Sequence, residues 1–175
     1  MIAGKIIFIK NGMKFLDINN LNRNEAHKLL KELKNPINIL DYKDVYNQIV
    51  QSILYSSETY RCLVIDKINQ ITYDFSVHTT PIDTRFSITL RFKKNNIHLI
   101  RLDFGDSITH TNNIGTPQEE KIRGPHVHFL APPDKHSPKN VIPIGSIDEF
   151  KNIKVIKEAF LKFIEYANIK EQKAQ

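Results

Sequence analysis

The sequence has 175 residues, of which 41% are hydrophobic and 25% charged, so it is long enough for one folded domain and too apolar for a disordered chain. It contains no run of roughly 18 apolar residues, the length that spans a membrane, and the first residues lack the apolar core of a signal peptide. The single cysteine, Cys62, excludes an internal disulfide and a cysteine-based zinc cluster. We therefore expect a cytoplasmic protein with one domain over residues 1–175 and no membrane partner.

The net charge of +6 at pH 7 suggests a polyanionic partner, but the charge is not concentrated in one segment. Residues 1–58, 59–130 and 131–175 each carry a net charge of +2. Proteins that bind nucleic acid more often gather their basic residues on one face or one arm. Direct nucleic-acid binding is therefore not the favoured function.

The N-terminal residues predict a β-hairpin followed by a helix. Asn11-Gly12 lies between two apolar runs within residues 1–20, which is typical of a tight hairpin because both turn positions need a positive φ. Asn22 and Glu25 have the spacing of a capping box, so a helix should begin there. Asn35-Pro36 is expected to end that helix, because the residue before a proline avoids helical geometry.

The middle of the chain predicts a second helix and then an antiparallel meander. Residues 41–55 carry apolar side chains at helical spacing. Beyond them the apolar period changes to two, and short polar turns separate runs rich in β-branched and aromatic residues. These strand-like runs are 60–66, 71–78, 85–92 and 97–104.

The remaining segments complete an α+β fold, in which two or three helices pack an antiparallel sheet. Residues 105–125 have few apolar side chains and read as a long surface loop, and loops of this length in a compact domain are usually functional or disordered. A short strand follows at residues 126–130. A last helix is expected over residues 146–168, with Ser146 and Glu149 as its capping box.

The most informative chemical feature is a pair of histidines in the sequence Gly124-Pro125-His126-Val127-His128. Residues two apart on a strand project from the same face, so His126 and His128 should present two imidazoles side by side. His110 in the preceding segment is the best candidate for a third metal ligand. Asp103 is expected to be either a fourth ligand or an acceptor for an imidazole N–H. An imidazole-rich site with at most one carboxylate favours zinc.

Three other interpretations of these and nearby residues compete with a metal site. His126 and His128 could be ordinary polar residues on an exposed strand. His78-Thr79-Thr80 has the pattern of half a two-histidine phosphodiesterase site, but the chain lacks the second half. Arg101 and Asp103 alternate on one strand face and could form a simple ion pair.

Several of these motifs resemble a family of small uncharacterised bacterial and prophage proteins. The shared elements are Arg101-Leu102-Asp103, His110-x-Asn112 and Gly124-Pro125-His126-x-His128, followed by a closing amphipathic helix. The likeness covers about residues 59–168. The family usually has a Gly-Pro-Pro run before the first histidine, whereas this chain has Asp106-Ser107-Ile108-Thr109, which weakens the assignment of His110.

The chain also resembles, in size and plan, zinc-containing anti-CRISPR proteins carried by phages and other mobile genetic elements. That resemblance implies a stoichiometric inhibitor that binds a type II CRISPR-Cas effector, a host defence protein, and blocks its loading of target DNA. The alternative is a metal-dependent or histidine-based RNase of the toxin type, in which the three histidines act on a phosphate and Arg101 stabilises its charge. A zinc ion closed by three histidines and Asp103 would favour the inhibitor, because a catalytic zinc keeps an open position.

Overall fold

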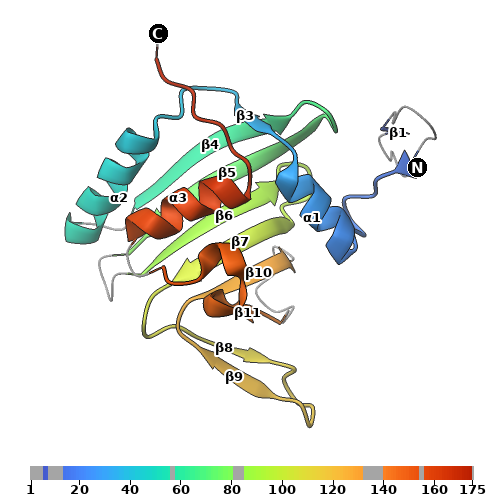
Figure 1. The fold of residues 1–175 in the computed structure, drawn as a ribbon, viewed down its shortest axis with the longest axis vertical. Coiled ribbons are helices and arrows are strands. Elements are labelled where there is room, and N and C mark those ends of the chain that lie inside the picture. Colours follow the sequence, from blue (N-terminus) through green and yellow to red (C-terminus); the bar gives the residue numbers. More distant parts are fainter. Residues whose placement is uncertain are drawn as a thin grey trace.

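An antiparallel sheet covered by helices on one face forms the body of the protein (Figure 1). The computed structural model describes residues 6–7, 14–55, 58–80, 85–131, 140–153 and 156–174. Within these residues the main sheet has seven strands in the order β11-β10-β7-β6-β5-β4-β3, and every neighbouring pair is antiparallel. Its strands are β3 Lys34–Pro36, β4 Glu58–Asp66, β5 Ile71–Thr79, β6 Phe86–Phe92, β7 His98–Phe104, β10 His126–Ala131 and β11 Ile142–Pro143.

The predicted α+β class and the predicted meander are both confirmed. Each of the four strand-like runs overlaps one of the consecutive strands β4 to β7, and each strand pairs with the next. The N-terminal hairpin is also formed, because β1 (Ile6–Ile7) pairs with β2 (Lys14–Phe15). Its Asn11-Gly12 turn lies outside the described residues.

Three α-helices are found in the described part of the chain: α1 Arg23–Lys31, α2 Tyr42–Tyr55 and α3 Ile156–Tyr166. The capping box is confirmed, since the Asn22 side chain accepts from the Glu25 backbone N–H and the Glu25 side chain accepts from the Asn22 backbone N–H. Helix α1 nevertheless ends at Lys31, earlier than predicted, and Asn35-Pro36 belongs to strand β3.

All three helices pack on the same face of the sheet (Figure 1). Helix α1 lies against β10, α2 against β4 and β5, and α3 against β6. The core between these layers is aromatic and aliphatic; the Phe75 and Phe163 rings, for example, join β5 to α3 with centroids 6.3 Å apart. Cys62 is part of this core. No helix of the described residues lies on the opposite face of the sheet (Figure 1).

A fully buried lysine joins the ends of two helices. Lys34 is 0% exposed, and its ammonium group donates to the carbonyls of Leu29, Leu30 and Glu32 at the end of α1 and of Ala167 just after α3, at 2.7–3.1 Å. Burial lowers the pKa of Lys34 to about 8, although nearby carboxylates raise it in part. A cation here satisfies helix-terminal carbonyls that would otherwise lack donors.

The predicted loop over residues 105–125 is wrong, because this segment contains a second hairpin. Strands β8 (Thr109–Asn112) and β9 (Glu120–Arg123) pair antiparallel and project from the body of the molecule as an arm (Figure 1). The strands are short and polar, and Ile122 is the buried apolar side chain of the pair. The usual alternation of apolar and polar residues is therefore absent, which explains the error.

The predicted start of the last helix is also wrong. Two 3₁₀ turns, η1 (Ile144–Ser146) and η2 (Asp148–Phe150), occupy the expected first turns, and neither has a side-chain cap. Lys151 is extended and Asn152 has a φ of 65°, which stops helical propagation before α3 begins. Phe150 is still buried, so the apolar pattern predicts its burial correctly although the α-helix does not extend to this residue.

Candidate metal centre

Strand β10 sends His126 and His128 to the face of the sheet opposite the helices. Val127 between them is fully buried in the core, as the alternation predicts. In the register with β7, His126 lies opposite Asp103 and His128 lies opposite Arg101. The two imidazoles therefore border a carboxylate and a guanidinium that come from the neighbouring strand.

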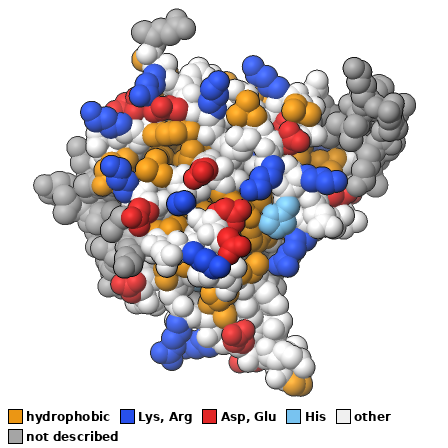
Figure 2. Space-filling view, in the orientation of Figure 1, with side chains coloured by type: hydrophobic (Ala, Val, Ile, Leu, Met, Phe, Trp, Pro, Cys, Tyr) orange, Lys and Arg blue, Asp and Glu red, His pale blue; other side chains and the backbone are white. Residues whose placement is uncertain are grey.

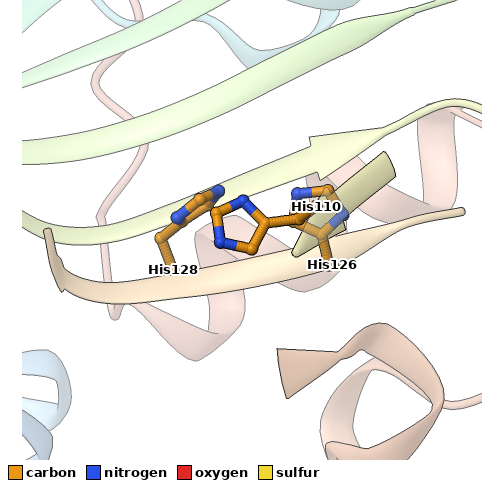
Figure 3. A group of neighbouring side chains, drawn as sticks. All are labelled: His110, His126 and His128. Atoms are coloured by element: carbon orange, nitrogen blue, oxygen red, sulfur yellow. The ribbon is translucent and has the colours of Figure 1, made fainter. Parts of the chain in front are cut away.

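The arm supplies the third imidazole. His110 on β8 brings its ring to those of His126 and His128, with ring centroids 5.7 Å and 5.2 Å away (Figure 3). One nitrogen from each of the three rings lies within 4.8 Å of the others. The structure thus brings together the three histidines that the sequence proposed as ligands.

Polar contacts join the arm to the residue that precedes β11 and close the base of the arm. Asn112, which is buried, donates from Nδ2 to the Val141 carbonyl at 3.0 Å, and its Oδ1 accepts from the Val141 backbone N–H at 2.7 Å. The Gly124 backbone N–H donates to the Ile108 carbonyl at 2.9 Å. Gly124 has a φ of 80°, a left-handed conformation that glycine adopts without strain, and so the chain can turn sharply from β9 into β10.

The hydrogen bond of His126 determines which of its ring nitrogens can bind a metal ion. Its Nδ1 lies 2.9 Å from the Gly124 carbonyl, which can only accept, so Nδ1 carries the proton and Nε2 keeps its lone pair. Burial lowers the pKa of His126, partly offset by that hydrogen bond and by Asp103, so the ring stays neutral. A neutral ring with a directed lone pair is the form that binds a metal ion.

Asp103 is bound on both of its oxygens. Oδ1 accepts from Arg101 Nε at 2.7 Å, Oδ2 lies 3.1 Å from His128 Nε2, and Oδ2 is 3.8 Å from His126 Nε2. Burial raises the pKa of Asp103, but the His128 hydrogen bond and Arg101 lower it by more, so the carboxylate stays ionised. This arrangement favours the orienting role for Asp103, in which it holds an imidazole in place, over the role of fourth ligand.

His98 lies near the site. Strict alternation along β7 would place it on the other face of the sheet, the face that packs against the helices. Counting back from Asp103 in steps of two reaches Leu99, but the pairing of β6 with β7 shifts there by one residue. Leu99 and Ile100 are both buried, and His98 lies on the face that carries Arg101. Burial, with Arg101 and Arg91 nearby, lowers the pKa of His98 from 6.5 to about 4.

The depressed pKa of His98 predicts acid sensitivity. Between pH 6.5 and 4 the unfolded chain binds a proton that the folded protein does not, so stability is lost as pH falls, by up to about 3 kcal/mol. Urea unfolding in chelator across this window should show that His98→Gln flattens the fall. His78→Gln, at an exposed position on β5, should keep the parental slope. An unchanged slope in His98→Gln would contradict the assignment.

The remaining histidine named from the sequence, His78, does not lie in this cluster. His78 is exposed on β5, and its Nδ1 lies 2.8 Å from the Thr59 hydroxyl. His136 lies outside the described residues.

The fold and the site together define an α+β protein with a three-histidine cluster on the side of its sheet opposite the described helices. A model for a family of unknown function (DUF6978) matches residues 21–169, and the chain belongs to this family. No curated protein and no solved structure matches the chain. None of the helices in the described ranges is long and apolar enough to cross a membrane.

Proposed function

We propose that the chain binds one zinc ion through His110, His126 and His128. The observation that carries the proposal is the convergence of one nitrogen from each ring within 4.8 Å. Nitrogens bound to one tetrahedral zinc at about 2.0–2.1 Å lie roughly 3.4 Å apart, so small rotations of the rings would suffice. The carbonyl of Gly124 and the carboxylate of Asp103 supply the outer hydrogen bonds that orient ligating imidazoles.

The position of the ligands suggests what the ion does. His110 belongs to the arm, whereas His126 and His128 belong to the main sheet. An ion shared by the three rings fastens the arm to the edge region of the sheet. We therefore assign the zinc a stabilising role in the fold, because an ion that binds only the folded arrangement of the three rings stabilises it.

The protein as purified should carry about one equivalent of zinc. Elemental analysis and titration with zinc after chelation test this directly. His110→Ala should lose most of the metal, because two imidazoles hold zinc far more weakly than three. His78→Ala, which removes an exposed histidine from the same sheet, should bind zinc as the parent does. Substoichiometric metal in the parent after zinc is added would refute the proposal.

A protein-binding role is favoured by the arm. It projects from the body and so presents a surface that another protein can contact, and Ile114 lies exposed at its tip (Figure 1). On the helix-bearing face, lysine and arginine side chains are scattered among acidic ones and form no single basic surface (Figure 2). Together with the anti-CRISPR resemblance, this supports the proposal that the protein inhibits a type II CRISPR-Cas effector by binding it in the bacterial cytoplasm.

Such an inhibitor should act stoichiometrically. With purified effector, guide RNA and target DNA, loading of the target should fall and saturate near a one-to-one ratio of this protein to the effector. Ile114→Asp should weaken inhibition, because it replaces the exposed apolar side chain at the tip of the arm with a charge, while Ile68→Asp, at another exposed isoleucine, should not. Degradation of RNA by catalytic amounts of the protein would favour the RNase instead. No effect on several type II effectors would reject the inhibitor.

A further inference from the structure

Arg101 has hydrogen-bonding capacity that the protein leaves unused beside the histidine cluster. It lies directly opposite His128 on β10 and opposite Thr89 on β6. Its Nε donates to Asp103, and its side chain is 40% exposed. A guanidinium has five N–H donors, and Arg101 makes no other hydrogen bond to the described part of the chain. The terminal nitrogens are therefore available to a ligand.

The net positive charge of the zinc centre beside Arg101 favours the binding of an anion. Imidazoles bind zinc as neutral rings, so the ion keeps its two positive charges. Arg101 and Asp103 neutralise each other as an ion pair. The local excess of positive charge is then that of the ion itself, and an exchangeable anionic oxygen is the usual way to balance such a centre.

The ligand set has room for that oxygen. Three imidazoles leave one position of a tetrahedral zinc without a protein ligand. Asp103 is a carboxylate beside the cluster, but both of its oxygens are already bound, to Arg101 and His128. A ligand that reaches the fourth position would also lie beside Arg101, which adjoins His128 across the strand pair.

We propose that the zinc centre and Arg101 together bind a phosphate group, with one oxygen on the ion and the others on the guanidinium. This inference rests on the zinc site proposed above. A planar guanidinium matches two oxygens of a phosphate, and a metal ion accepts a third. The phosphate is either the free anion or the phosphodiester of a nucleotide chain, since both present the same oxygens.

Substitution of Co²⁺ for zinc allows phosphate binding to be tested separately from metal binding. The chelated protein is loaded with Co²⁺, whose visible absorption reports the ligands around the ion. Inorganic phosphate, and in a second arm a dinucleotide with one phosphodiester, is then titrated at constant pH. We expect a saturable spectral change with phosphate. A change in both arms indicates a site open to nucleotide chains, whereas a change with phosphate alone indicates a small-anion site.

Two variants test whether Arg101 is responsible for the spectral change that phosphate produces. Arg101→Gln should bind Co²⁺ but weaken phosphate about tenfold or more, because the charged donors are lost. Arg61→Gln is the matched control: Arg61 lies in the same cross-strand row, three strands or about 14 Å from Arg101, and should behave as the parent.

Three results would overturn the inference. The first is a Co²⁺ spectrum that neither phosphate nor the dinucleotide alters. The second is equal phosphate affinity in Arg101→Gln and the parent. The third is a phosphate-free spectrum altered by Asp134→Asn or His136→Ala, which would reveal a protein ligand in the fourth position. Failure to bind Co²⁺ at all would instead refute the zinc site.

Discussion

Replacing both His126 and His128 with alanine should lower the melting temperature of the zinc-loaded protein by about 6 to 10 °C. A ligand that binds only the folded state stabilises it by about 2.7 kcal/mol at a concentration 100 times its Kd, and each kcal/mol shifts the Tm of a protein of this size by about 2–4 °C. The same shift should follow when the parent is treated with a chelator. Thermal melting with and without added zinc measures both effects.

The response to zinc is the decisive comparison. The double variant should melt at the same temperature with zinc and with chelator, because the cluster retains one of its three rings. His78→Ala should keep the parental response, since it changes an exposed ring on another strand. A parent whose melting does not respond to chelator would reject the stabilising role. A double variant that loses a hydrolytic activity without losing stability would favour an enzyme.

Lys34→Met should destabilise the protein by about 3 kcal/mol, because it leaves several buried carbonyls at two helix ends without a donor. Removing the buried charge also removes the cost of its desolvation. The loss in the free energy of unfolding is therefore smaller than the summed contributions of the individual hydrogen bonds. Urea unfolding at pH 7 measures the change. The matched control is Lys31→Met at the end of α1, whose exposed ion pair with Glu149 at 3.5 Å should contribute less than about 1 kcal/mol.

Equal losses in Lys34→Met and Lys31→Met would contradict the role given to the buried ammonium group. If Lys34→Met does not fold, Lys34→Arg provides a second test. Arginine keeps the charge and the donors but is larger than the fully buried site, so it should retain part of the stability.

The sheet could be predicted from the sequence because its strands bury one face and expose the other. Phe75 and Val77 on β5 alternate with polar neighbours in this way, and the helices repeat apolar residues at their own period. The arm lacked that signal, since its two strands bury few apolar side chains. The start of α3 was predicted too early because Phe150 continues the apolar pattern through turns that are not α-helical.

The candidate site was predictable only where it depends on one strand. Alternation alone places His126 and His128 on a common face. The contact of His128 with Asp103 depends on the register between β10 and β7, which local patterns do not encode. The position of His98 depends on a shift in the pairing of β6 with β7, and a single sequence carries no clear sign of it.

The spacing of the three imidazoles along the chain has a consequence for the order of folding. His110 and His128 are separated by 18 positions, so the loop that joins them closes at a small entropic cost. The contact between Lys34 and the Ala167 carbonyl spans 133 positions and requires the last helix to dock. Because local contacts form sooner than distant ones, the histidine cluster can assemble on the nascent arm and β10 long before the two helix ends are joined.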